Sequence, residues 1–417
     1  MNNAIFTPAD ILIPGERHLE AWSVIACDQF SSERAYWDKI REKVGKAPST
    51  LNMIIPEAYL GETDAGKKTL EIAKAMDECL MGGTLREIQA SYVLVERTLP
   101  GGKVRRGLVG AIDLEEYDFS GKEARILASE GTVLDRLPAR VAVRREAALE
   151  LPHIMVFIND PGKTVIEPLA GKSQSLPPLY DFELMEGGGH ARGSRVHGSA
   201  AEEVVAAMGA LGEKSRPLMV VGDGNHSLAA AKLYWEERKK HLGTHERESH
   251  PARRALVEVN NVYDPAISFE AIHRVIWGSE PEEFIGSLRD AFGGSLRDAL
   301  GDGSAREQAY KLRWATRRAT GEIEATAVSI GSMLATLQGF LDDHVAMHGC
   351  EIDYIHGEES VMELTGDGRG IGIILPPMDK ADLFDTVAAG GVFPKKSFSV
   401  GSAKEKRYYL ECRRIRI

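Results

Sequence analysis

The 417-residue sequence contains few cysteines, and none of the four is arranged as part of a close pair. Cys27, Cys79, Cys350 and Cys412 are scattered along the chain, with no Cys-x-x-Cys motif. This spacing indicates neither a disulfide framework nor a cysteine-ligated zinc site. Cys27 alone lies inside a polar motif, where a small buried apolar role and a nucleophilic role are both open.

Long apolar runs and an excess of positive charge are also missing. No segment approaches the roughly 18 uninterrupted apolar residues of a membrane span, and the first residues lack the pattern of a signal peptide. The net charge of −11 argues against broad binding to nucleic acid or anionic membranes, although a local basic pocket for a phosphate stays open. We therefore expect a cytoplasmic protein without nucleic acid or membrane partners, and the oligomeric state stays open.

Heptads, internal repeats and low-complexity tracts are absent as well. The composition, 43% hydrophobic and 27% charged, is that of an ordinary globular protein, and the length predicts two or three cores. Strand-like and helix-like segments are interspersed, which predicts an α/β (mixed α+β) protein with mixed sheets. We expect a smaller N-terminal α+β unit over residues 1–125 and a larger body over residues 126–417, with an anion site and a basic C-terminal segment.

The most informative segment covers residues 217–235. Residues 218–221 form an apolar run typical of a buried strand, and residues 227–237 carry apolar residues at helical spacing. Between them, Gly222 and Gly224 permit backbone angles and close approaches that a Cβ would forbid. A strand, a glycine turn and a helix N-terminus together form an anion site, because backbone N–H groups and the helix dipole point to one place.

The polar residues of this turn support a phosphate as the guest. Asp223, Asn225 and Ser227 are residue types that begin helices. His226 contributes nothing to capping, so its position in the first turn favours contact with an anion or proton transfer. A plain strand-to-helix connection capped by Asn225 or Ser227 is the alternative.

The ten residues from Gly222, which read Gly-Asp-Gly-Asn-His-Ser-Leu-Ala-Ala-Ala, resemble a box of the bacterial family called domain of unknown function 1015. The resemblance extends to segments at residues 26–33, 48–51, 129–136, 150–154, 263–265, 272–274, 393–398 and 406–409. More distantly, the box is similar to the phosphate-binding box of the ParB/sulfiredoxin superfamily, which includes CTP-binding ParB proteins, sulfiredoxin and an ADP-dependent free serine kinase. The resemblance implies a ParB/sulfiredoxin-like phosphate-binding core.

A mixture of carboxylates, hydroxyls and arginines follows Ser129. Arg136 and Arg140 are the predicted phosphate ligands, because a guanidinium fork matches two phosphate oxygens. Glu130 is the carboxylate that we favour as a base. Structural ion pairs would give the same local composition.

Two further places are predicted to contact a substrate or a second anion group. Asp28 and Gln29 follow the strand-like run of residues 22–27, so they are candidate substrate contacts, with an Asx turn as the alternative. His273 lies on a predicted strand, where alternation places it opposite Arg274, so at most one of the two can face a pocket. The remaining candidates belong to the basic C-terminal segment, which a solvated tail would also explain, and are Lys395 and Lys396.

Other segments define the predicted framework. The pattern predicts a helix over residues 64–81, a hairpin formed by residues 89–98 and 104–114, and a flexible connection or strand pair within residues 171–199. Further amphipathic helices and strands are expected over residues 281–292, 304–312 and 333–339 and from about residue 358. The lysines after Gly66 lack the Ser or Thr of a phosphate loop, so no such loop is predicted there.

Three classes of function are compatible with these features. The leading one is an enzyme that acts on a phosphorylated small molecule or nucleotide, with phosphoryl transfer to or from a hydroxyl such as that of serine. There Glu130 or Asp223 would orient the hydroxyl, His226 would contact the transferring phosphate, and Mg²⁺ with ATP, ADP or CTP would be the cofactors. The alternatives are a nucleotide-gated binding module, as the ParB resemblance implies, and a metal-dependent hydrolase, for which no ligand spacing is present.

Overall fold

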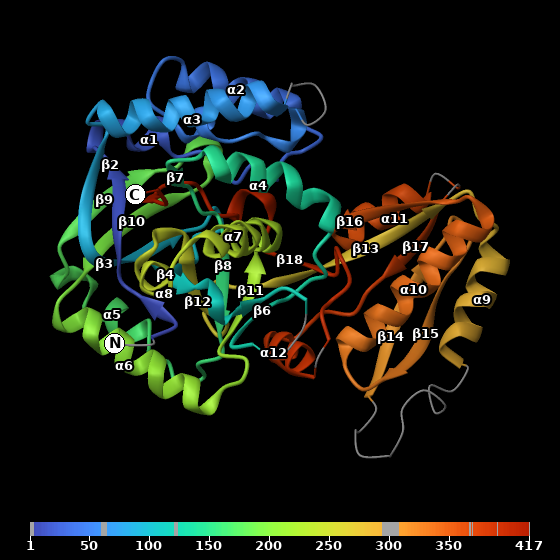
Figure 1. The fold of residues 1–417 in the computed structure, drawn as a ribbon. Helices are drawn as coiled ribbons and strands as arrows, with labels where there is room; N and C mark the ends of the chain where they lie inside the picture. Colours follow the sequence, from blue (N-terminus) through green and yellow to red (C-terminus); the bar gives the residue numbers. More distant parts are fainter. Residues whose placement is uncertain are drawn as a thin grey trace. The chain divides into compact units, whose positions relative to one another are not determined.

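A computed structural model describes residues 4–59, 65–120, 124–293, 308–366, 368, 370–389 and 391–416, and Figure 1 shows its ribbon. The chain divides into two compact units, which we describe one at a time. Unit 1 comprises Met1–Ala128, Thr132–Ile267 and Ser402–Ile417, and unit 2 comprises Ser129–Gly131 and Ser268–Gly401. The units therefore do not divide at residue 125, because strands from both sides of that position, β4 (Val104–Asp113) and β12 (Arg254–Asn261), pair in one sheet.

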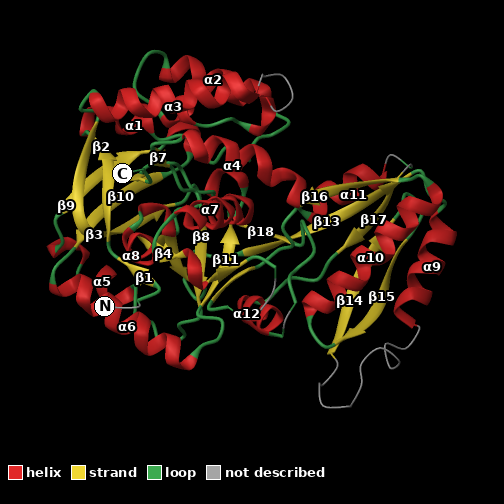
Figure 2. Cartoon of the chain, in the orientation of Figure 1, coloured by secondary structure: helices red, strands yellow, loops and turns green. Residues whose placement is uncertain are grey.

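Both units mix helices with strands (Figure 2), so the predicted mixed α/β class is confirmed. Unit 1 is built on one large sheet with the strand order β5-β6-β11-β8-β12-β4-β3-β10-β9, in which β1 also pairs with β4 and β2 with β3. The other strands of this sheet are β1 (Phe6–Thr7), β2 (Ala9–Pro14), β3 (Leu85–Thr98), β5 (Tyr117–Asp118), β6 (Ile126–Ala128), β8 (Met155–Ile158), β9 (Pro178–Glu183), β10 (His190–Val196) and β11 (Met219–Asp223). Two further strands of unit 1, β7 (Leu149–Glu150) and β19 (Arg413–Arg414), pair with each other. Parallel pairs join β11 to β6 and β12 to β8, so the sheet is mixed.

The helices of unit 1 cover the two faces of this sheet. They are α1 (Leu19–Trp22), α2 (Arg34–Val44), α3 (Ala65–Met81), α4 (Leu137–Glu146), α5 (Glu167–Ala170), α6 (Ser199–Lys214), α7 (Asn225–Arg238) and α8 (Thr244–Ser249). Along β3, Val93 and Val95 join the hydrophobic core that contains α2 and α3, whereas Tyr92 and Leu94 join the core that contains α6 and α7. This two-residue alternation is what a sheet covered on both faces requires.

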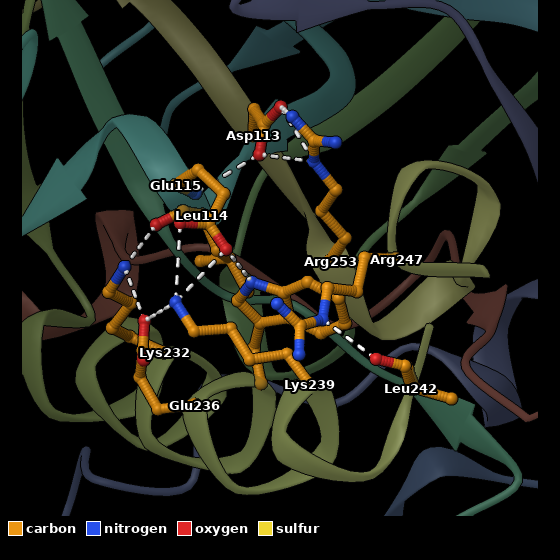
Figure 3. A network of polar contacts seen from close by, with 10 residues as sticks. Asp113, Leu114, Glu115, Lys232, Glu236, Lys239, Leu242, Arg247 and Arg253 are labelled. Carbon is orange, nitrogen blue, oxygen red and sulfur yellow. Dashed lines mark hydrogen bonds and ion pairs between the residues drawn. The ribbon is translucent and has the colours of Figure 1, made fainter. Parts of the chain in front are cut away.

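A network of polar contacts fixes α7 beyond its N-terminal turns (Figure 3). Lys232 donates to the carbonyl of Leu114 at 2.8 Å, and Lys239 pairs with both Glu115 and Glu236. The indole of Trp235, which is buried, donates to Glu115 at 2.5 Å. Because these contacts join α7 to the end of β4, they set the position of the whole helix, including the end that follows β11.

The C-terminal segment of unit 1 runs through its interior rather than over its surface. Ala26 donates to the carbonyl of Arg407 at 3.0 Å, and Tyr409 donates to the carbonyl of Val24 at 2.9 Å. Residues 22–27 therefore form no strand of the main sheet: Trp22 ends α1, and Ile25 makes only an isolated bridge to Tyr408. The predicted strand is wrong there, because the apolar residues are buried against a segment almost 400 positions later.

Unit 2 contains a smaller antiparallel sheet with the order β15-β14-β17-β13-β16, in which β18 also pairs with β13. Its strands are β13 (Phe269–Trp277), β14 (Gln308–Ala315), β15 (Thr320–Ala327), β16 (Glu351–His356), β17 (Gly370–Ile374) and β18 (Phe398–Val400), and its helices are α9 (Pro281–Gly293), α10 (Ile330–His348), α11 (Glu358–Gly366) and α12 (Lys380–Ala388). Val361 of α11 packs against Val275 and Ile374 of the sheet. None of the helices in the described ranges has the length and apolar character needed to cross a membrane.

Candidate functional site

The turn at the predicted anion site contains fewer residues in the structure than the sequence pattern indicated. Strand β11 continues to Asp223 and α7 begins at Asn225, so Gly224 alone makes the turn. Gly224 has φ +80° and ψ 24°, a left-handed conformation that favours glycine, and a Cβ there would lie 3.0 Å from the backbone of Ile154. A Cβ on Gly222 would lie within 2.0 Å of the ring of Phe157. Packing therefore requires Gly222, and the left-handed conformation together with packing favours glycine at Gly224.

A lysine from the C-terminal segment reaches this turn. The Nζ atom of Lys406 lies 3.1 Å from one oxygen of Asp223, whose other oxygen accepts the N–H of Gly224 at 2.9 Å. Only 9% of the Lys406 side chain is exposed. A nearly buried cation therefore stands at the start of α7, where the helix dipole also favours an anion.

The backbone around Lys406 is held by two buried arginines of the main sheet. Arg97 donates to the carbonyls of Lys404 and Lys406, and Arg105 donates to the carbonyl of Glu405 at 2.8 Å. Guanidinium groups suit this task because several fixed donors serve neighbouring acceptors. The lysine is consequently positioned from its own main chain, independently of any ligand.

Asp28 faces the same cation. Burial raises the pKa of the Asp28 carboxyl. This effect is outweighed by the positive charges of protonated His153 and of Lys406 and by the hydrogen bond that Gln29 donates at 3.1 Å, all of which lower the pKa. The pKa of Asp28 therefore lies below its ordinary value, and the carboxylate is ionised at neutral pH. The structure thus brings the predicted substrate residues Asp28 and Gln29 to the surroundings of Lys406, although not at the end of a sheet strand.

A hydrogen-bonded series of side chains borders the turn. The oxygen of Ser227 lies 3.5 Å from Nε2 of His153, and Nδ1 of His153 lies 3.0 Å from the hydroxyl of Tyr409. That hydroxyl also accepts the N–H of Cys27 at 3.3 Å. Burial raises the pKa of Tyr409 well above its ordinary value and raises that of the Cys27 thiol to about 12, so both groups stay protonated. A neutral thiol is a poor nucleophile, which favours the small apolar role for the partly buried Cys27.

His226 has a definite partner in unit 1. Its Nε2 atom accepts the backbone N–H of Val133 at 3.2 Å. A ring nitrogen that accepts a hydrogen bond carries no proton, so in this arrangement Nε2 offers a phosphate no donor. The predicted contact between His226 and a transferring phosphate therefore stays a prediction that involves its other ring nitrogen.

A cavity of about 200 Å³ opens beside the start of α7. Its lining includes Ser227, His153 and Tyr409, together with residues of α3, α4 and the segment at residues 53–55. Arg140, one of the predicted phosphate ligands, lines the cavity and pairs with Glu57 at 2.7 Å. The side chain of Arg136, the residue before α4, is exposed, and its phosphate role stays a prediction.

The sequence profile of the family described as "Protein of unknown function (DUF1015)" matches residues 9–352. The chain belongs to the DUF1015 family. The predicted family membership is thereby confirmed. None of the curated proteins matches the sequence.

Several solved structures are similar to this DUF1015 protein at low sequence identity. A mutant free serine kinase in complex with ADP is 10% identical, with a TM-score of 0.40, over 75% of this chain and 93% of that one. A conserved hypothetical protein from Pyrococcus furiosus is 12% identical, with a TM-score of 0.34, over 74% and 92% of the two chains. SbnI from Staphylococcus aureus with a C-terminal truncation is 10% identical, with a TM-score of 0.35, over 70% and 83%. Similarities of this size assign no activity to the chain.

Four predicted residues of the DUF1015 protein belong to unit 2. The backbone of Glu130 forms an isolated parallel β-bridge with Phe393. Burial lowers the pKa of Arg274 to about 10, and electrostatic interactions with Tyr354 and Glu130 partly oppose this effect. The side chains of Lys395 and Lys396 are exposed, and the carbonyl of Lys396 accepts a hydrogen bond from Arg274 at 3.0 Å. The roles assigned to Glu130, Lys395 and Lys396 stay predictions.

His273, the fourth of these residues, has a structural partner. Its Nδ1 atom accepts the backbone N–H of Leu375 at 3.2 Å, and burial lowers its pKa to about 4. Arg274, on the opposite side of the strand, is also buried and lies 4.5 Å from the ring of Tyr354. The alternation was predicted, but the contact with a substrate stays a prediction.

The low pKa of His273 predicts a pH-dependent stability for unit 2. Below its unfolded pKa of about 6.5, the unfolded chain takes up a proton that folded unit 2 does not bind until about pH 4. We expect unit 2 to lose about 3 kcal/mol of stability as the pH falls from 7 to 4. Hydrogen exchange of the Leu375 amide, corrected for its intrinsic pH dependence, measures this loss. His273→Gln keeps an acceptor that does not titrate and should flatten the slope; equal slopes in both proteins would contradict the assignment.

Three side chains of the site were not among the predicted site residues. His153, Lys406 and Tyr409 all lie in segments that carry the family resemblance, at residues 150–154 and 406–409. That resemblance was the signal that could have found them. The local density of positive charge near the C-terminus also pointed to the segment that contains Lys406, whereas a histidine after a proline is an ordinary feature of surface loops.

Proposed function

We propose that unit 1 binds a phosphorylated ligand of the nucleotide class at the start of α7 and transfers a phosphoryl group to or from a small hydroxylated metabolite. The observation that carries this proposal is the Lys406–Asp223 pair at the Gly224 turn, where a nearly buried cation meets a helix N-terminus. The resemblance of the box at residues 222–231 to the ParB/sulfiredoxin phosphate-binding box favours the same ligand.

Phosphoryl transfer requires mainly positioning and neutralisation of charge, and unit 1 has groups for both. Lys406 would bind phosphate oxygens while Asp223 holds its ammonium group in place. The positive end of the α7 dipole adds to this attraction. Arg140, one of the two predicted phosphate ligands, lines the cavity. On binding, a phosphate oxygen would replace part of its contact with Glu57.

The acceptor hydroxyl requires a carboxylate that is ionised. Because Asp223 already accepts from Lys406 and Gly224, we assign the orienting role to Asp28, whose pKa is depressed. The bond from phosphorus to the nucleotide oxygen would break while the bond to the hydroxyl oxygen forms, and the hydroxyl proton would pass to Asp28.

Magnesium would accompany the nucleotide rather than occupy a site made by protein ligands alone. Among the described residues, no group of three or more His, Cys, Asp or Glu side chains could hold a metal ion. Mg²⁺ commonly takes one or two carboxylates and completes its shell with phosphate oxygens and water. Asp28 would supply such a carboxylate, and Mg²⁺ would supply further neutralisation of the phosphate charge.

The test combines binding with turnover. The purified chain is incubated with Mg²⁺, with ATP, ADP or CTP, and with hydroxylated metabolites that include L-serine, and phosphorus NMR detects new phosphoesters. Calorimetry measures nucleotide binding to the wild type and to Gly224→Ala, in which a Cβ strains the left-handed turn by roughly 1–2 kcal/mol and displaces the start of α7. We expect at least a tenfold loss of affinity in this variant.

Gly209→Ala is the matched control, because a Cβ on that α6 residue meets nothing within 4 Å. Wild-type affinity in Gly224→Ala would contradict the site. Binding without turnover would favour the nucleotide-gated binding module over the enzyme, and turnover that needs no nucleotide would favour a hydrolase.

A further inference from the structure

The cavity beside the start of α7 is lined largely by apolar side chains. Its nonpolar residues are Met53, Ile54, Ile55, Ile72, Met76, Ala139, Val143, Ala147, Leu149, Leu151 and Ala230. Apolar walls of this kind gain free energy by removing nonpolar surface of a guest from water. They offer little to a guest that consists mainly of hydroxyl, amino and carboxyl groups.

The ionised side chains that line the cavity already compensate one another. Arg140 pairs with Glu57 at 2.7 Å, and Arg144 pairs with Glu150 at 2.5 Å. Glu150 also pairs with Arg413 at 2.7 Å. The lining therefore presents no excess carboxylate for an ammonium group, and its charges leave the apolar surface as the main attraction for a guest.

The size of the cavity sets the size of that guest. A cavity of about 150 Å³ with apolar walls is large enough to bind benzene. At about 200 Å³, this cavity has room for a nonpolar group of at least that size. A molecule such as serine has about as many non-hydrogen atoms as benzene, but it would place an ammonium group and a carboxylate against these apolar walls.

The cavity adjoins the start of α7, so one molecule can occupy both the cavity and the proposed phosphate site. Ser227, in the first turn of α7, and His153 both line the cavity and lie 3.5 Å apart. A guest with its nonpolar group between α3 and α4 can therefore place a hydroxyl or phosphoester at the start of α7. Cys27, the residue before Asp28, also lines the cavity.

We propose that the hydroxylated substrate of this site carries a nonpolar aliphatic or aromatic group of about six carbons, which the cavity holds during the reaction. This inference rests on the proposed function only for the position of the phosphate. It replaces serine, as the expected acceptor, with alcohols or phosphoesters that have a substantial nonpolar part.

The test uses phosphate, ethyl phosphate, butyl phosphate and hexyl phosphate as probes of the purified full-length chain. Calorimetry should show affinity rising roughly fourfold with each added methylene, which corresponds to about 0.8 kcal/mol per buried CH₂, until the cavity is filled. Ala139→Trp, on the exposed side of α4 at the cavity, should remove this chain-length dependence and leave the affinity for inorganic phosphate within about threefold of wild type. Met81→Trp is the control, because Met81 is 81% exposed on α3 and does not line the cavity.

Failure of this inference is distinguishable from failure of the proposed function. Hexyl phosphate that binds no tighter than inorganic phosphate would overturn the inference while the phosphate site stands. If no phosphate compound binds, 1-hexanol is the remaining probe, and binding that Ala139→Trp abolishes would still support a nonpolar guest. Adenosine that competes more strongly than 1-hexanol for the cavity would overturn the inference in favour of a nucleobase.

Discussion

Replacement of Lys406 by methionine is expected to reduce the affinity for a phosphorylated ligand at least a hundredfold. The substitution keeps the length of the side chain but removes the nearly buried cation. Asp223 then faces the incoming phosphate without its partner at 3.1 Å, so attraction is lost and repulsion is added. Loss of one partner from a desolvated charge pair at a binding interface costs about 2–5 kcal/mol or more, and about 3 kcal/mol corresponds to a factor of more than a hundred. Calorimetric titration with ATP or ADP measures the change.

Two companion variants make the result specific. Lys404→Met removes an exposed positive charge two residues away and should change the affinity less than threefold. Lys406→Met combined with Asp223→Asn should bind better than Lys406→Met alone, because the unpaired carboxylate is gone. Wild-type affinity in a folded Lys406→Met protein would exclude the lysine from the anion site.

Replacement of Arg407 by leucine is expected to destabilise unit 1 by about 5 kcal/mol or more, a large part of the 5–15 kcal/mol by which domains are usually stable. Arg407 is buried and bonds Glu258 at 2.7 Å and Glu411 at 2.6 Å. Burial raises the pKa of Glu258, but the charges of Arg407 and Arg105 lower it by more than burial raises it, so the carboxylate is charged in the folded protein. Without Arg407, that charge loses its main compensation, and urea unfolding followed by circular dichroism should show the loss.

The control for this variant is Arg414→Leu. Arg414 is half-exposed and lies 3.5 Å from Glu87, so its loss should cost less than about 1 kcal/mol. Arg407→Leu combined with Glu258→Gln and Glu411→Gln should recover part of the stability, because fewer buried charges remain. A cost similar to that of Arg414→Leu would mean that the buried cluster does not hold the C-terminal segment.

Local patterns predicted most of the framework because each depends on neighbours in sequence. The alternation along residues 89–98 and 104–114 predicted the pair formed by β3 and β4, and the helical spacing of residues 64–81 predicted α3, whose described part begins at Ala65. The segment at residues 171–199 contains the predicted strand pair, β9 and β10. Hydrophobic periodicity determines these elements since it decides which face can be buried.

Pairings between distant residues decided what local patterns could not. The division of the chain follows from β4 and β12, which are about 150 residues apart, and the apolar residues 22–27 are buried by the C-terminal segment instead of joining a sheet. The composition of β4 or of residues 22–27 would be the same if each packed against a different part of the chain. Periodicity identifies an element that must be buried, but it does not identify the surface that buries it.

The candidate site divides in the same way. The sequence by itself determined the glycine turn of residues 222–227, because glycine adopts the φ of +80° at Gly224 without the strain of a Cβ, and because Gly222 leaves room for the ring of Phe157. Only the tertiary structure placed Lys406 against Asp223, Asp28 beside Lys406, and His153 between Ser227 and Tyr409. A backbone conformation is a local property that a residue type encodes, whereas the charge and the cavity beside it depend on which distant segments fold against that turn.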